Sequence, residues 1–335
     1  MHTLLLETID AAALAVLEEQ STITLADASA TALDNQALAD DPVAALDEPV
    51  LADVDAILTR GRGRVTSELM ARCPALRAIG RCGVGLDNID VDAASAAGIA
   101  VINAPGGATA TTAEHTVMLI LALVRRLFPQ VAAVKGDNWD IRDAVSTDEC
   151  AGKTLGVVGL GAIGSRVIEL CAALGMEVVA YNRTGPDNLP RSMRLLTLTE
   201  LLAEADIVTL HVALTPETRG LIGQAELAAM RRDAFLVNTA RGALVDTDAL
   251  LEALDSGQLA GYAADGVDPE PPGRGDRLIH HPNTLITPHS AALTEATYRR
   301  MCLRTVHNVL GYLADSEYEA DSVFNADRLP AARRR

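Results

Sequence analysis

Aromatic residues, paired cysteines and long apolar runs are all scarce in this sequence. Aromatic residues make up 3% of its 335 residues, so aliphatic side chains must form most of the core, as suits a protein of helices and parallel strands. The cysteines are odd in number and lack CxxC spacing, which excludes a disulfide framework and disfavours a zinc site. We therefore expect reduced thiols and no metal. The most apolar stretch, residues 116–124, is about half the length of a membrane span and indicates a buried helix.

Basic charge is also in short supply, because 28 Lys and Arg stand against 45 Asp and Glu, for a formal net charge of −17. An acidic surface repels nucleic acid and anionic membranes, so we expect neither as a partner. A site for an anionic substrate would need local positive charge against this field. The N-terminal residues lack the basic segment and apolar run of a secretory signal, and we expect a cytoplasmic protein.

Short apolar runs alternate with helical patterns along most of the chain, which indicates βαβ units and parallel sheets. The first set of expected strands covers 3–6, 56–59, 76–80 and 100–103, with helices at 11–19, 66–72 and 91–97. A long helix is expected at 112–127. The second set of strands covers 154–158, 177–181, 207–211, 234–238, 261–265 and 284–286, and a last helix 295–313. The second set is large enough for a full dinucleotide-binding sheet.

A GxGxxG motif follows the first strand of the second set and opens a helix, which is the context that dinucleotide binding requires. Gly159 permits the tight turn, Gly161 lets the backbone approach a pyrophosphate, and Gly164 lets helix and strand pack closely. The helix N-terminus would face the phosphates with its unpaired N–H groups. We expect Ala162 and Ile163 to belong to the same cofactor site.

The next strand ends at Asn182, Arg183 and Thr184, about twenty residues past the motif. Sheets that bind NAD usually place Asp or Glu here to hold the ribose 2′-hydroxyl. Asn182 lacks the charge that would repel a 2′-phosphate, and Arg183 with Thr184 could bind one. The sequence therefore favours NADP(H) over NAD(H), while the alternative reading makes Arg183 a solvated loop residue.

Polar residues stand at the carboxyl ends of later strands, where open α/β sheets bind ligands. Arg241 follows strand 234–238, Asp265 and Glu270 lie in the stretch DGVDPEP, and His289 follows strand 284–286. Hydride transfer to a 2-keto acid needs a cation that polarises the keto oxygen, a proton donor, and a partner that keeps the donor protonated. Arginine, histidine and a carboxylate are the residue types for these tasks.

With these motifs in order, the sequence resembles the D-isomer-specific 2-hydroxyacid dehydrogenases over essentially its whole length, most closely their D-3-phosphoglycerate dehydrogenase branch. The matching stretches are GRCGVGLDNID, NAPGG, AEHT, GKTLGVVGLGAIG, HVALTPETRGLIG, FLVNTARGALVD, DGVDPEP and TPHSAA. Two departures stand out: Ala213 replaces a usual proline, and Ser290-Ala291-Ala292 replaces the common Ile-Gly-Gly. Both flank the expected cofactor site.

The resemblance implies that Arg241 binds the carboxylate and keto oxygen of the substrate, and that His289 is the general acid and base. It implies that Glu270 pairs with His289, raising its pKa, and that Asp265 holds the nicotinamide carboxamide. Backbone N–H groups of one loop would cradle the substrate carboxylate: Cys82, Gly83, Val84 and Gly85. Further cofactor contacts are expected from His211, Val212, Thr239, Ala240 and Ser290. His115, in an apolar helical pattern, is interpreted as a core or interface residue.

The resemblance also implies two α/β domains, Rossmann-like and flavodoxin-like, each a parallel sheet flanked by helices. Residues 1–104 plus 296–335 would bind substrate and residues 105–295 the dinucleotide, with a cleft between them that closes to exclude water. It further implies a homodimer built on the region of the 112–127 helix.

Arg60 and Arg81 match positions that face the substrate pocket in the phosphoglycerate dehydrogenase branch. Two arginines would suit a second anionic group, so a phosphorylated or phosphonylated 2-hydroxy acid is the leading hypothesis. The alternative is a hydroxypyruvate or glyoxylate reductase with structural arginines. A hypothesis from another class is an NAD(H)-sensing corepressor, which the lack of an extended C-terminal tail and the two arginines disfavour. Formate dehydrogenase, a related enzyme, would use neither the extra arginines nor His289 as a proton donor.

Overall fold

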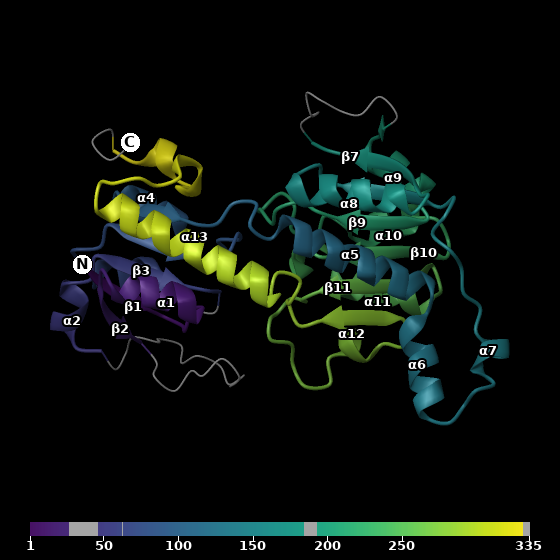
Figure 1. The fold of residues 1–335 in the computed structure, drawn as a ribbon. Coiled ribbons are helices and arrows are strands. Elements are labelled where there is room, and N and C mark those ends of the chain that lie inside the picture. The colour runs from purple at the N-terminus through teal and green to yellow at the C-terminus, as the bar shows by residue number, and fades with distance from the viewer. Residues whose placement is uncertain (27–45, 62, 184–192, 331–335) are drawn as a thin grey trace. The chain divides into compact units, whose positions relative to one another are not determined.

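The computed structural model describes residues 1–26, 46–61, 63–183 and 193–330 (Figure 1). Thr184, one of the predicted cofactor residues, lies outside the described residues. The chain divides into two compact units, residues 1–108 with 293–335, and residues 109–292. Their assignment as substrate and dinucleotide domains, with boundaries after residues 104 and 295, stays a prediction.

The first unit is a parallel five-stranded sheet in the order β2-β1-β3-β4-β5, the doubly wound arrangement of flavodoxin-like folds. Its strands are β1 (His2–Leu5), β2 (Thr22–Leu25), β3 (Ala56–Thr59), β4 (Ala78–Arg81) and β5 (Ala100–Ile102). Its helices are α1 (Ala11–Glu18), α2 (Glu48–Ala52), α3 (Ser67–Ala71), α4 (Val91–Ala96) and α13 (Glu295–Leu313), followed by the 3-10 turns η2 (Ala320–Ser322) and η3 (Ala326–Arg328).

Short polar residues define where these helices begin. Asp10, Thr66, Asp90 and Thr294 each accept a hydrogen bond from a backbone N–H in the first turn of the helix that follows. Such N-caps satisfy donors that have no partner inside the helix. The aliphatic faces of α1 and α13 then close over the sheet, so that the core there consists mostly of small and aliphatic residues, with Tyr312 among them.

The second unit is a parallel seven-stranded sheet in the order β12-β11-β10-β9-β6-β7-β8, a dinucleotide-binding order extended by one strand. Its strands are β6 (Thr154–Val158), β7 (Glu177–Tyr181), β8 (Arg194–Leu195), β9 (Ile207–Leu210), β10 (Ala234–Asn238), β11 (Leu259–Asp265) and β12 (Thr284–Thr287). Its helices are α5 (Thr109–Val124), α6 (Leu127–Lys135), α7 (Ile141–Ala144), α8 (Ala162–Ala173), α9 (Leu198–Glu204), α10 (Gln224–Ala229), α11 (Thr247–Asp255) and α12 (Arg277–His280), with the 3-10 turn η1 (Gly242–Leu244).

The structure adds two strands to those expected and shortens one expected helix. Strands β2 and β8 were not foreseen, and β8 is only two residues long. The helix expected over 112–127 ends at Val124, and the chain turns at Arg126, whose φ is 45°. Pro129 explains the break, because in a continuous helix its ring would clash with the carbonyl of Arg125. The side-chain amide of Gln130 donates to the carbonyls of Arg125 and Arg126 at this break.

No single helix among the described residues is both long and apolar enough to cross a membrane. The pair α5 and α6 meets that test only when the two are counted together across a 66° bend.

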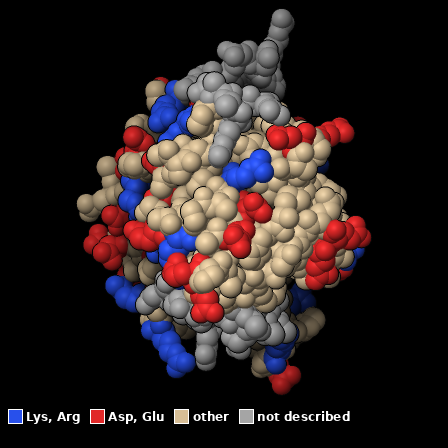
Figure 2. Space-filling view, turned by 90° about the vertical axis from the view of Figure 1, so that its left-hand side faces the viewer, with Lys and Arg blue, Asp and Glu red and all other residues tan. Residues whose placement is uncertain are grey.

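On the face drawn in Figure 2, acidic and basic side chains are interspersed among uncharged ones. Acidic side chains on this face lie in small groups, with lysines and arginines among them.

Candidate active site

The carboxyl ends of five parallel strands lie at one edge of the second unit's sheet. Parallel register aligns Val158 with Leu210, Leu210 with Asn238, and Asp265 with Thr287. The loops that leave β6, β9, β10, β11 and β12 therefore begin at the same edge. This is the edge at which open α/β sheets bind their ligands.

The glycine turn after β6 has the shape that a dinucleotide requires. Gly159 has φ 104°, and a Cβ there would lie 2.7 Å from the carbonyl oxygen of His211. A Cβ on Gly164 would lie 2.1 Å from the carbonyl oxygen of Gly159, so both positions exclude a side chain. A Cβ on Gly161 would meet nothing within 4 Å. Gly161 is the N-cap residue of α8 and gives no side-chain hydrogen bond to the first turn, where the N–H groups of Ala162 and Ile163 lie; such a helix start suits an anion.

The predicted ribose position lies beside this turn. The side-chain oxygen of Asn182 accepts a hydrogen bond from the backbone N–H of Leu160, 3.2 Å away. Arg183 follows it and is exposed. Burial lowers the pKa of the neighbouring His211 to about 4, so its imidazole is neutral near pH 7. The polar groups beside the glycine turn are therefore the amide of Asn182, the neutral imidazole of His211 and the exposed guanidinium of Arg183.

His289 and Glu270 form a hydrogen-bonded pair at the same edge. The Nδ1 atom of His289 lies 2.8 Å from Oε2 of Glu270, which leaves Nε2 as the nitrogen directed elsewhere. This bond to Glu270 raises the pKa of His289, while partial burial and the charge of Arg241 oppose the rise. A histidine paired in this way can carry a proton near neutral pH and give it up.

Gly266 provides the space for the Glu270 carboxylate. It has φ 104°, and a Cβ there would lie 2.0 Å from Oε1 of Glu270. The same oxygen accepts a hydrogen bond from the backbone N–H of Val267 at 3.2 Å. The glycine after β11 therefore fixes the position of the carboxylate that binds His289.

The loop that carries Arg241 packs directly against the loop that carries Glu270. A Cβ on Gly242 would lie 2.3 Å from the carbonyl carbon of Val267, so the two backbones touch. Asn238 holds the loop from inside: its amide donates to the carbonyl of Arg241 and accepts from the N–H of Ala240. Arg241 is partly buried, and its Nη1 donates to the carbonyl of Ala240 at 2.7 Å.

Asp265 is buried and receives the loop that carries His289. Its two oxygens accept hydrogen bonds from the N–H groups of Ser290 and Ala291, both at 2.8 Å. The hydroxyl of Thr287 donates to it at 2.6 Å. The Nε2 atom of His115 lies 3.0 Å from that hydroxyl. His115 is thus connected to the site, a link that its apolar helical surroundings in the sequence did not signal.

The arginines predicted to bind substrate lie together in the first unit. Arg60 sits with its guanidinium 5.6 Å from the centre of the Tyr298 ring and with Nε 3.6 Å from Glu7. Burial would lower the pKa of Arg60, but the hydrogen bond with Tyr298 and the charge of Glu7 outweigh burial. The pKa of Arg60 is therefore raised above its usual value. These contacts with Tyr298 and Glu7 fix the side chain of Arg60, so it is not a solvated surface residue.

Arg81 lies between two glycines of the same unit. A Cβ on Gly83 would overlap its Nη1, and a Cβ on Gly61 would lie 3.6 Å from its Nη2. Gly83 thus admits the guanidinium to the loop predicted to cradle a carboxylate. In that loop Cys82 is buried, and the carbonyl of Val84 accepts a hydrogen bond from Asn103 at 2.7 Å.

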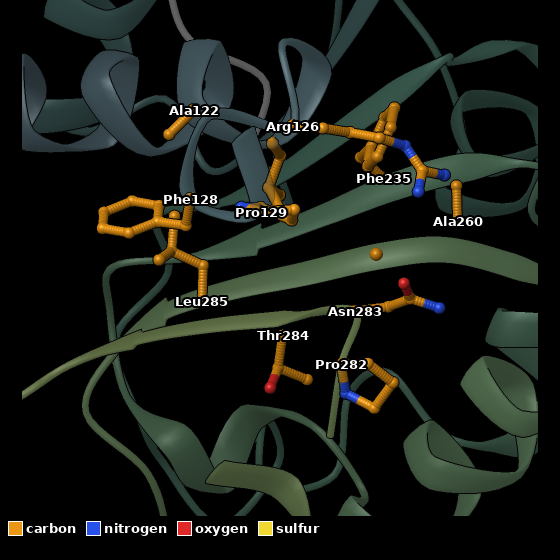
Figure 3. Close-up of a pocket in the computed structure, with 12 residues that line it drawn as sticks. Ala122, Arg126, Phe128, Pro129, Phe235, Ala260, Pro282, Asn283, Thr284 and Leu285 are labelled. Atoms are coloured by element: carbon orange, nitrogen blue, oxygen red, sulfur yellow. The ribbon is translucent and has the colours of Figure 1, made fainter. Parts of the chain in front are cut away.

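A separate pocket lies at the opposite end of the second unit's sheet (Figure 3). It is formed by the starts of β10, β11 and β12 together with the break between α5 and α6: Ala122, Leu123, Arg126, Phe128, Pro129, Phe235, Ala260, Gly261, Pro282, Asn283, Thr284 and Leu285. The catalytic candidates stand at the ends of the same strands, so this pocket has no part in their chemistry. No group of residues that could hold a metal ion occurs within the described ranges.

Comparison with known families agrees with this geometry. The model of the D-isomer specific 2-hydroxyacid dehydrogenase NAD binding domain matches residues 117–291, more than half of the chain. The chain belongs to this family. The match begins within α5 and ends beside His289, so it includes the glycine turn and all three catalytic candidates.

Two curated 2-hydroxyacid dehydrogenases illustrate the range of similar proteins. The D-3-phosphoglycerate dehydrogenase of Bacillus subtilis (strain 168) is 39% identical over 260 residues, which cover 77% of this chain and 49% of that protein. The glyoxylate reductase of Aeropyrum pernix is 39% identical over 268 residues, covering 78% of this chain and 80% of that protein. The chain spans about half the length of the phosphoglycerate dehydrogenases it matches.

Solved structures similar in sequence to this chain have the same fold. The TT0316 protein from Thermus thermophilus is 37% identical, with a TM-score of 0.82 over 95% of this chain and 98% of that chain. An NADPH-dependent glyoxylate/hydroxypyruvate reductase from Sinorhizobium meliloti is 26% identical, with a TM-score of 0.81 over 99% and 98%. The predicted fold class and family are confirmed.

Proposed function

We propose that this protein is an NAD(P)-dependent oxidoreductase that interconverts a D-2-hydroxy acid and its 2-keto acid. The observation that carries the proposal is the 2.8 Å bond between His289 and Glu270, in one unit with the glycine turn and the Arg241 loop. When bound, the nicotinamide ring would supply or accept the hydride. The rest of the chemistry falls to side chains of this chain.

In the reducing direction, Arg241 would bind the substrate carboxylate and polarise the keto oxygen. His289 would give its Nε2 proton to that oxygen as the alcohol forms, while Glu270 holds the ring through Nδ1 and stabilises its charged form. Asp265 would orient the nicotinamide carboxamide and hold the loop of His289. In the oxidising direction His289 accepts the proton.

For the substrate we propose a phosphorylated or phosphonylated acid, with 3-phosphoglycerate as the leading example. Arg60 and Arg81 support this proposal. Arg60 is packed beside the Tyr298 ring and Arg81 beside Gly61, and a guanidinium group binds phosphate bidentately. The loop of Cys82, Gly83, Val84 and Gly85 would hold the carboxylate with its N–H groups.

The alternative, a reductase of glyoxylate or hydroxypyruvate, has one structural observation in its favour. Glu7 lies 3.6 Å from Arg60 and offsets its charge, so Glu7, Arg60 and Arg81 together carry one net positive charge. A small substrate with a single carboxylate needs no second anion site. The glyoxylate reductase relative, which this chain matches over 80% of its length, is consistent with this alternative.

We propose NADP(H) as the preferred cofactor. Asn182 stands where a carboxylate would repel a 2′-phosphate, and the exposed Arg183 follows it. The matched test compares Asn182→Asp with the wild type. The aspartate should weaken NADPH binding and favour NADH, measured as the ratio of the two dissociation constants. A wild type that already prefers NADH strongly would contradict the assignment.

The first experiment is oxidation of NADPH and of NADH, followed by absorbance, with four keto acids: 3-phosphohydroxypyruvate, phosphonopyruvate, hydroxypyruvate and glyoxylate. Preferred turnover of the first two supports the phosphorylated substrate, and Arg60→Ala should then raise KM for them far more than for glyoxylate. Preferred turnover of the last two selects the alternative. Cofactor binding without turnover of any of the four would exclude these substrates and point first to another keto acid and second to a sensing role.

We also propose a homodimer formed through α5 and α6. Helix α6 has no buried residue, and several large apolar side chains of this region are exposed: Met118, Leu121, Leu127, Phe128, Val131, Val134 and Trp139. A nine-residue helix is unstable in water without packing, so an apolar partner surface is needed. Sedimentation should show a dimer that Phe128→Asp weakens, whereas a monomeric wild type would contradict the proposal.

A further inference from the structure

We propose that His115 is a positioning residue for the catalytic loop, acting through Thr287 and Asp265 on the backbone of His289. The proposal rests on the dehydrogenase function proposed above. His115 lies in the stretch AEHT, apart from the residues assigned to the reaction, and it reaches the site from α5. Its imidazole side chain is 15% exposed, so it is largely enclosed where it meets Thr287.

The hydrogen bonds of this group have a fixed direction. Asp265 is a carboxylate acceptor, so the single proton of the Thr287 hydroxyl goes to its Oδ1 atom at 2.6 Å. The carbonyl of Ala264 competes for that proton only at 3.3 Å. The Thr287 oxygen can then act toward His115 only as an acceptor, which requires a proton on Nε2 of His115. A chain of donors thus runs from His115 through Thr287 to Asp265.

Asp265 uses the same carboxylate to hold both residues that follow His289. Its Oδ1 atom accepts from Ser290 and its Oδ2 atom from Ala291. His289 itself has φ 53°, a backbone conformation that costs a non-glycine residue free energy and persists only where its surroundings enforce it. The bonds to Asp265 provide that enforcement on one side, and the N–H of His289 bonds the carbonyl of Thr287 on the other.

Two adjacent residues of α5 each form a hydrogen bond at the start of a catalytic loop. Thr116, the residue after His115, bonds the hydroxyl of Thr239 at 2.7 Å, where the Arg241 loop begins. His115 bonds Thr287, where the His289 loop begins. Adjacent residues of one helix therefore hold the starts of both catalytic loops, which fits a role in aligning Arg241 with His289.

The test compares His115→Leu, which removes the donor, with His115→Gln, which keeps an N–H donor of similar reach. His280→Leu, on the exposed face of α12, is the matched control for the loss of a histidine. The direct readout is amide hydrogen exchange at Ser290 and Ala291, because these N–H groups are protected by Asp265. We expect exchange to accelerate about tenfold in His115→Leu and to stay near the wild-type rate in the other two variants.

Activity supplies the second readout. His115→Leu should lower kcat about tenfold with little change in KM for the keto acid, and His115→Gln should restore most of it. The double variant with Thr287→Val should be no worse than Thr287→Val alone, because the hydrogen bond of His115 reaches Asp265 through the Thr287 hydroxyl. Unchanged exchange at Ser290 and Ala291 in His115→Leu, or effects that add fully in the double variant, would overturn the proposal. If the wild type reduces no keto acid, the proposed function fails, whereas the exchange measurement still decides the role of His115.

Discussion

In each unit a buried carboxylate holds a loop that carries a candidate functional residue. The loop carries Arg60 in the first unit and His289 in the second. The carboxylate comes from the end of a different strand in each case. Glu7, just past β1, accepts hydrogen bonds from the N–H groups of Arg60, Gly61 and Gly63 at 2.7–3.1 Å. Asp265, the last residue of β11, accepts from Ser290 and Ala291. In each case backbone donors that the loop cannot satisfy by itself converge on a single side chain.

The two loops differ in where they carry strain. The Arg60 loop contains Gly61 and Gly63, and a Cβ on Gly63 would lie 2.6 Å from that of Leu6, so close packing is achieved by small residues. The His289 loop instead places its functional residue at φ 53°. A loop that binds substrate can have a relaxed backbone. The loop that positions the proton donor His289 has a strained backbone, which Asp265 and its partners enforce.

The largest effect on activity is expected from Asp265→Ala, which removes the acceptor for the His289 loop. Release of Ser290 and Ala291 should misplace His289 and lower kcat about 100-fold. Asp246→Ala is the control, because Asp246 also accepts a backbone N–H, from Ala249, but caps α11. Similar kcat values for the two variants would show that Asp265 does not govern the loop.

Gly266→Ala should have the next largest effect, since its Cβ would displace the Glu270 carboxylate. Gly275→Ala introduces the same kind of positive-φ strain with nothing within 4 Å, so the pair separates backbone strain from loss of the carboxylate. We expect kcat to fall on the order of tenfold further in Gly266→Ala than in Gly275→Ala. Equal rates would mean that Glu270 need not occupy its present position.

Glu270→Gln should shift the pH dependence more than the maximal rate. Glu270 raises the pKa of His289, so its loss lowers that pKa. Reduction needs protonated His289 and declines as pH rises through this pKa; in the variant the decline should therefore begin at lower pH. Oxidation needs the neutral ring and should extend to lower pH. Profiles of kcat/KM in both directions measure the shift, and coincident midpoints for variant and wild type would exclude the pairing.

Glu7→Gln should change stability and leave the maximal rate nearly unaltered. Burial alone would raise the pKa of Glu7, but bonds from Gly63, Gly61, Thr59 and Arg60 outweigh it and lower the pKa. A lowered carboxyl pKa stabilises the fold above its unfolded value, and this contribution is lost as pH falls through the folded value. Urea unfolding at pH 7 should show a loss of about 1–3 kcal/mol that shrinks below about pH 4. Glu48→Gln, at an exposed ion pair with Arg72, should cost much less.

The sequence predicted the family, the parallel sheets and helix α13 because each has a local signal: motifs, apolar runs or helical periodicity. The assignments of Arg241, Glu270 and His289 stay predictions, although the structure gathers them at one edge. Glu7 and His115 were missed because their partners lie more than fifty residues away along the chain. A single Glu after a strand, or a His in an apolar helix, has no pattern that reports such a partner.

The five buried cysteines allow each unit to report its own opening. Cys73, Cys82 and Cys302 belong to the first unit, and Cys150 and Cys171 to the second. Burial raises the pKa of Cys73 to about 11 and that of Cys171 to about 12, so neither forms an appreciable amount of thiolate near neutral pH while folded. Alkylation of Cys73 in the first unit and of Cys171 in the second therefore has to wait for local or global unfolding. Timed labelling followed by peptide mass analysis would read the lifetimes of the two halves separately, without any engineered probe.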